Sequence, residues 1–65
     1  MKFFYKGRQI RQSKTHDYTH AVVREREDGD IVVWGCMSSL PLAMKRIGDA
    51  KRINPDYKIV ELERR

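Results

Sequence analysis

Cysteine and long apolar runs are scarce in this chain, and each scarcity argues against a class of protein. The single cysteine, Cys36, has no second thiol for an internal disulfide, which argues against a disulfide-stapled secreted scaffold. No stretch approaches the roughly 20 apolar residues of a membrane span. Residues 1–6 also lack the apolar run of a signal peptide. We therefore expect a cytoplasmic protein with no membrane partner.

The residue types that catalysis needs are few and poorly spaced. His16, His20 and Cys36 are the only soft metal ligands. Strand residues four positions apart lie about 13 Å apart, so the two histidines cannot share one ion there. The four glycines are isolated and form no phosphate-binding loop. We expect no enzyme, no cofactor and no metal site, with Cys36 serving as a small buried hydrophobe.

Enough apolar material is present for one small core. The chain has 65 residues, of which 40% are hydrophobic and 35% charged, so we expect a single domain over residues 1–65. A chain of this length buries only about 60% of the surface that its unfolded form exposes, which predicts modest stability.

Positive charge is concentrated at the N-terminal end. The net charge is +5, and residues 1–16 contain five basic and no acidic side chains. Acidic residues begin at Asp17 and gather between Glu25 and Asp30. A basic end favours an anionic partner, because lysine and arginine release counterions from phosphates. The alternative is a solvated basic surface that serves solubility.

Two hairpins are predicted from turn residues. Phe3 to Ile10 indicates a hairpin that turns at Lys6-Gly7, with Phe3 opposite Ile10 and residues 11–17 as a loop. Tyr18–Glu27 and Ile31–Met37 flank Asp28-Gly29, a dipeptide suited to a type I′ turn. That register pairs Glu27 with Asp30, Val23 with Trp34, and Ala21 with Cys36. Alternation then puts one set of residues on a core face: Ala21, Val23, Val32, Trp34 and Cys36. The other face is mixed: Tyr18, His20, Val22, Arg24, Arg26, Ile31 and Val33.

One helix and one further strand complete the pattern. Residues 39–53 read as the only helix, with Ser39 as N-cap and Asn54-Pro55 as the stop. Its apolar face combines Leu40, Ala43, Met44, Ile47 and Ala50, and Trp34 is expected to pack against Met44 or Ile47. Tyr57–Glu63 alternates as a last strand. The predicted fold is α+β: a small antiparallel sheet of order β-β-β-β-α-β with one helix on one face.

The remaining surface predicts a binding module. We expect nucleic-acid binding through the basic N-terminal hairpin and an open sheet face, since arginines read base edges and aromatics stack on single-stranded bases. The candidate residues are Lys6, Arg8, Arg11, Lys14, Tyr18, Arg24 and Arg26. Arg24 and Arg26 could instead pair with the acidic residues of their hairpin. The alternative function is a protein-interaction module, such as an inhibitor or a homodimer joined through an edge strand. The chain would then be a monomer or a weak homodimer.

Part of the sequence resembles a known DNA-binding domain. Tyr18–Glu25, the turn Asp28–Asp30, the strand Ile31–Met37 and the Ser39-capped helix with Ala43 are similar to the DNA-binding domain of plant ethylene-response factors. Integrase N-terminal domains share that layout. The resemblance implies a three-stranded sheet, backed by one helix, that enters the major groove with Arg24 among its contacts. The strand Tyr57–Glu63 is additional to that layout. The general style also resembles small phage-encoded accessory proteins, many of which bind a host protein.

Overall fold

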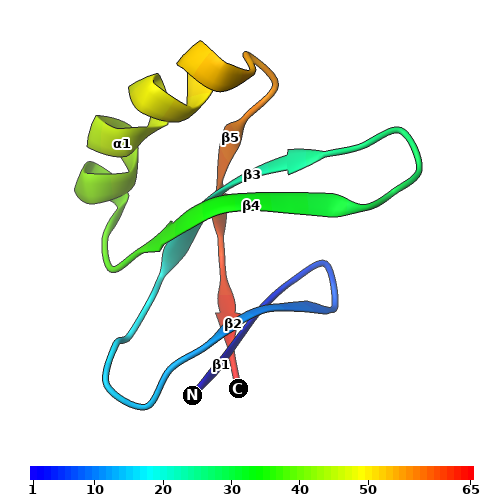
Figure 1. The fold of residues 1–65 in the computed structure, drawn as a ribbon. Coiled ribbons are helices and arrows are strands. Elements are labelled where there is room, and N and C mark those ends of the chain that lie inside the picture. The colour runs from blue at the N-terminus through cyan, green and yellow to red at the C-terminus, as the bar shows by residue number, and fades with distance from the viewer.

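The computed structural model describes residues 1–65 as six strands and one helix (Figure 1). In chain order the elements are β1 (Lys2–Tyr5), β2 (Arg8–Gln12), β3 (His20–Glu25), β4 (Ile31–Met37), α1 (Leu40–Ile53), β5 (Lys58–Glu61) and β6 (Glu63–Arg64). The α+β class is confirmed, and the order of elements differs from the prediction in that the last predicted strand is divided in two. The prediction of one sheet is wrong, because the strands form two.

Each sheet has three antiparallel strands. Sheet A has the order β2-β1-β6, and sheet B has the order β4-β3-β5. Strand β5 continues into β6 through Leu62, whose N–H donates to the Thr19 carbonyl at 2.9 Å. One extended segment therefore belongs to both sheets and carries the C-terminus to β1. The two chain ends lie side by side, joined by two backbone hydrogen bonds between Lys2 and Arg65 of 2.8 and 2.9 Å (Figure 1).

The first hairpin turns where the sequence predicts. Lys6 and Gly7 both have positive φ, at 50° and 76°, as a two-residue type I′ turn requires. The predicted pairing of Phe3 with Ile10 is wrong. Ile10 is the extra residue of a β-bulge, so Phe3 pairs with Arg11. The predicted loop over residues 11–17 correspondingly begins later, since β2 extends to Gln12.

The second hairpin has a three-residue loop rather than the predicted two-residue turn. The Gly29 N–H donates to the Arg26 carbonyl, the Arg26 N–H donates to the Asp30 carbonyl, and Gly29 has φ of 86°. This is a turn followed by a left-handed glycine. The register shift is corrected by a bulge at Trp34, so Ala21 pairs with Cys36 as predicted, whereas Val23 pairs with Val33. Tyr18 lies outside the strand, which begins at His20.

Helix α1 begins and ends at the predicted signals. The Ser39 hydroxyl accepts from the Leu42 N–H at 3.3 Å, and Asn54 is the C-cap. The helix contacts β3, β4 and β5 and so covers one face of sheet B. Its buried residues are Ala43 and Ala50. Leu40 and Met44 were expected on the apolar face, but they are 45% and 62% exposed, because the helix rests on its small alanines instead.

The helix-side core is built around Val22, which the sequence placed on the opposite face from the core. Val22, Met37, Ala43, Ala50 and Tyr57 form the buried cluster. Trp34 and Ile47 each pack against this cluster, whereas Met44, the other residue expected to contact Trp34, is exposed. The predicted assignment of faces fails because the bulge brings Trp34 and Val32 to the same side as Val22.

The other face of sheet B is also covered. Ala21 and Val23 point away from the helix, because they alternate with Val22, and both are fully buried. Glu25 shares that face and receives contacts from Tyr5 and Lys6. The β1–β2 hairpin therefore lies over this face, and Phe3 of β1 is likewise fully buried.

Candidate nucleic-acid interface

Sheet A and the loop that follows it carry the whole net charge of the chain. Residues 1–17 and 63–65, here called the basic region, contain seven basic and two acidic side chains. Residues 18–62 contain seven of each. Because β6 pairs with β1, the fold adds Arg64 and Arg65 to the basic N-terminal strands. The positive charge is thus gathered on one sheet and its loop, and the helix and sheet B are balanced.

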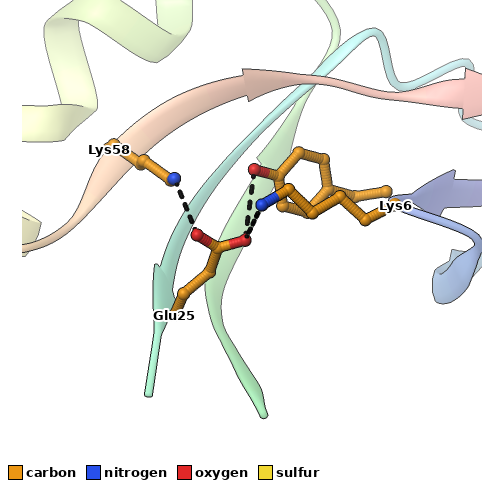
Figure 2. Close-up of polar contacts among 4 residues, drawn as sticks. Lys6, Glu25 and Lys58 are labelled. Carbon is orange, nitrogen blue, oxygen red and sulfur yellow. Dashed lines mark hydrogen bonds and ion pairs between the residues drawn. The ribbon is translucent and has the colours of Figure 1, made fainter. Parts of the chain in front are cut away.

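The Glu25 carboxylate lies at one border of the basic region and contacts three side chains there (Figure 2). Its carboxylate lies 2.6 Å from the Lys6 Nζ and 3.0 Å from the Lys58 Nζ, and it accepts a 3.5 Å hydrogen bond from the Tyr5 hydroxyl. The hydrogen bond from Lys6, followed by that from Lys58, lowers the pKa of Glu25 to about 2. The same hydrogen bonds raise the pKa of both lysines. Lys6 is therefore held mainly as a link between the hairpin and β3.

Arg8 is also engaged within the molecule. Its guanidinium donates to the Asp30 carboxylate at 3.0 Å, which ties β2 to the turn between β3 and β4. Both partners are largely exposed, so this ion pair is worth little and can exchange for another anion. Lys6 and Arg8 lie at the predicted hairpin, but each already has an acidic partner.

Three of the predicted residues have side chains that can still contact an external ligand: Arg11, Lys14 and Tyr18. The Arg11 guanidinium lies over the Tyr18 ring, 5.7 Å from its centroid. His16 stacks on the same ring at 5.6 Å, and Phe3 meets its edge at 5.3 Å. Arg11 and Lys14 are exposed and form no ion pair, so their charges are available to an anionic ligand.

Arg24 and Arg26 do not share a face with Tyr18, so the predicted grouping of these three residues on one sheet face is wrong. Arg24 alternates with Val23 and points to the helix side, where its guanidinium lies 5.7 Å from the Tyr57 ring centroid. Its Nε is buried with no hydrogen-bond partner. Arg26 is exposed in the turn between β3 and β4, among Glu27 and Asp28. The three residues expected on one surface lie apart: Arg24 is on the helix side, Arg26 is in the turn, and Tyr18 is in the loop before β3.

Sequence reasoning missed the contribution of Phe4 and the two C-terminal arginines. Phe4 alternates with the buried Phe3 and so faces outward from sheet A. The Arg65 guanidinium lies over its ring at 4.7 Å, while Arg64 donates to Asp17 at 2.7 Å. The alternation in Lys2–Tyr5 contained the signal for Phe4. Nothing local in the sequence indicated that residues 63–65 pair beside it.

His16, His20 and Cys36 are the residues from which a metal or nucleophile site would be built. No group of three or more His, Cys, Asp or Glu side chains is placed to hold a metal ion. Cys36 is a free, half-buried thiol, and burial raises its pKa. That shift disfavours the reactive thiolate. No helix of the protein has the length and apolarity needed to cross a membrane.

Sheet B, which helix α1 covers, is not built from three strands that are consecutive in the sequence. The strand before Tyr18 belongs to sheet A, and β5 takes its place beside β3. Comparison with protein-family models, curated proteins and solved structures found no match for this chain.

Proposed function

We propose that this chain is a non-enzymatic module that binds nucleic acid through the basic region. The observation that carries the proposal is the charge division: a net +5 on sheet A and its loop, against a balanced remainder. Clustered lysine and arginine side chains are the electrostatic footprint of nucleic-acid binding, because phosphate contacts release condensed counterions.

Aromatic side chains in the basic region and directly beside it support a single-stranded ligand. Phe4 and Tyr18 are half-buried, and each has an arginine beside its ring. Unpaired bases stack on such rings while the adjacent guanidinium meets the backbone, a combination common to single-strand binding proteins. Duplex bases are already stacked and gain nothing from these rings. We expect single-stranded DNA or RNA to bind more tightly than duplex.

The interface we propose is centred on Arg11, Lys14 and Tyr18. Lys6 and Arg8 lie at its border, where an incoming phosphate would compete with Glu25 or Asp30. Arg24, which the sequence resemblance assigns to DNA, packs on Tyr57 and is left outside. Arg26 is left outside as well, because its neighbours in the turn are acidic.

A salt titration of binding tests the proposal. Labelled random-sequence oligonucleotides, single-stranded and duplex, are titrated with protein and followed by fluorescence anisotropy from about 50 mM salt upward, since screening is weak at the start of that range. The combined substitution Arg11→Gln and Lys14→Gln should lower the slope of log K against log salt. Each lost contact contributes about 0.7 for a single strand or about 0.9 for duplex.

The matched control is Lys45→Gln with Arg46→Gln on helix α1. These residues are exposed, and their loss removes the same charge from outside the basic region. The control should leave the slope nearly unchanged. Absence of binding to any oligonucleotide at the lowest salt would overturn the function, and an equal effect of both double variants would overturn the interface.

A further inference from the structure

Strand β4 lies at an unprotected edge of sheet B. The order β4-β3-β5 leaves the second edge of β4 without a paired strand. The other outer strands of the two sheets are β2, β5 and β6, and each carries charged side chains. Strand β4, Ile31–Met37, carries none. Charged edge residues are a principal means by which proteins prevent sheets from joining, and β4 lacks this protection.

The side chains of β4 are only partly covered in the monomer. All but Met37 are half-buried, and they include the contiguous apolar run Ile31–Trp34. At seven residues β4 is also the longest strand of the chain. An added strand would satisfy its free backbone groups and cover the remaining apolar surface on both faces.

The charges at the two ends of β4 indicate which strand would add. The end at Ile31 follows a turn in which three acidic residues, Glu27, Asp28 and Asp30, outnumber the single basic residue Arg26, and of the acidic three only Asp30 forms an ion pair. The end at Met37 leads into helix α1, whose first turn has no acidic residue. A helix N-terminus carries partial positive charge. The two ends of β4 are therefore electrostatically opposite.

A second copy of this chain, running antiparallel, matches that polarity. It would bring the acidic turn of each copy beside the helix start of the other, twice over by symmetry. Parallel pairing would place two acidic turns together, which is repulsive. We propose that β4 pairs antiparallel with β4 of a second copy, joining two copies of sheet B into one six-stranded sheet.

The proposed register is centred on Trp34, because in that register each of the seven residues of one β4 strand lies opposite a residue of the other. Trp34 is the bulge residue of β4, so the ladder hydrogen bonds are assigned to the residues on either side of it. The two Trp34 side chains then lie near the symmetry axis. As the only tryptophan, Trp34 reports on this contact through its fluorescence.

Sedimentation equilibrium across a wide protein concentration range tests the proposal. We expect a reversible monomer–dimer equilibrium, with Trp34 emission shifting in step with dimer formation. Ile31→Lys should raise the dimer dissociation constant roughly tenfold or more, because the charge enters the interface twice. Ile31 is paired with Glu25, whose carboxylate already contacts Lys6 and Lys58, so the melting temperature of the variant is measured first to verify that the monomer folds.

Gln9→Lys provides the matched control. Gln9 is an exposed residue of the outer strand β2, so this variant adds the same charge at a different edge and should dimerise like the unchanged protein. A strictly monomeric protein up to millimolar concentration would overturn the proposal, as would equal weakening by both variants. Should Ile31→Lys fail to fold, amide hydrogen exchange of the unchanged protein tests the proposal instead. The amides of β4 should gain protection as protein concentration rises, and unchanged protection would overturn the proposed pairing.

Discussion

Phe3 has no solvent-exposed surface and meets the edge of the Tyr18 ring, with centroids 5.3 Å apart. It is the largest fully buried side chain of the molecule. It also lies where sheet A covers the rest of the structure, so its removal leaves a cavity between elements far apart in the sequence. A small domain with few buried side chains has little stability in reserve for such a loss.

We therefore predict that Phe3→Ala lowers the free energy of unfolding by about 3–5 kcal/mol, measured by urea denaturation. Trp34→Ala should cost less, because Trp34 is half-buried at the bulge of an outer strand. Phe4→Ala is the neighbouring control: its side chain faces outward, and its loss should cost least of the three. A larger cost for Trp34 than for Phe3 would show that the helix-side core dominates stability instead.

The elements are joined by contacts that cross between the sheets, and Glu25 is the centre of one such junction. It links the turn of the β1–β2 hairpin, through Lys6, to β5, through Lys58 (Figure 2). A carboxylate whose pKa is lower in the folded state than in the unfolded state stabilises the fold wherever the unfolded carboxyl is ionised. The pKa of Glu25 falls from 4.5 to about 2, so its contribution is present above pH 4.5 and is lost as pH falls toward 2.

Replacing Glu25 by glutamine should therefore flatten part of the acid-side decline in melting temperature between about pH 4.5 and pH 2. The effect should shrink in high salt, because the ion pairs are solvent-accessible. Glu61→Gln on β5 removes an exposed glutamate that has no ion pair and is the control. Parallel pH profiles for Glu25→Gln and the unchanged protein would contradict the assignment.

Elements whose signals are local could be predicted from the sequence. The Lys6-Gly7 turn, the Ser39 cap and the Asn54-Pro55 stop each depend on neighbouring residues, and all three are confirmed. The division into two sheets could not be predicted in this way. It depends on β5 pairing beside β3, and on β6 pairing beside β1, across most of the chain length.

The bulges explain the remaining errors in the predicted elements. Ile10 adds one residue to β2 and changes the partner of each residue beyond it, whereas the three-residue loop shifts the β3–β4 register only as far as Trp34, whose bulge restores it. Alternation counted along the sequence therefore placed Val22 on the wrong face. For the candidate site, the basic character of residues 1–16 was visible in composition, whereas the partners of Lys6 and Arg8 were not. Those partners come from residues 19 or more positions away.

At the scale of the whole molecule, the two chain ends form one structural and electrostatic unit. Strand β6 pairs Glu63 with Phe4 and Arg64 with Phe3, and the Lys2–Arg65 hydrogen bonds extend the ladder. The same three residues bring two of the seven basic side chains of the basic region. Residues 63–65 thus supply both the third strand of sheet A and part of its charge.

Two variants separate these roles. Deleting residues 63–65 removes the β6 strand and both arginines, so the melting temperature should fall and nucleic-acid affinity should weaken. The double substitution Arg64→Gln and Arg65→Gln keeps the backbone pairing, because those hydrogen bonds are made by main-chain groups. It should change the free energy of unfolding by no more than about 0.5 kcal/mol, as surface substitutions usually do, so the melting temperature should stay nearly the same. Its binding slope against log salt should still fall, by about 0.7 per lost phosphate contact on a single strand.

Thermal denaturation and the anisotropy titration, run on both variants, check the two effects. If the double substitution destabilises the fold as much as the deletion does, the arginine contacts to Asp17 and Phe4, rather than the β6 ladder, hold the chain ends together.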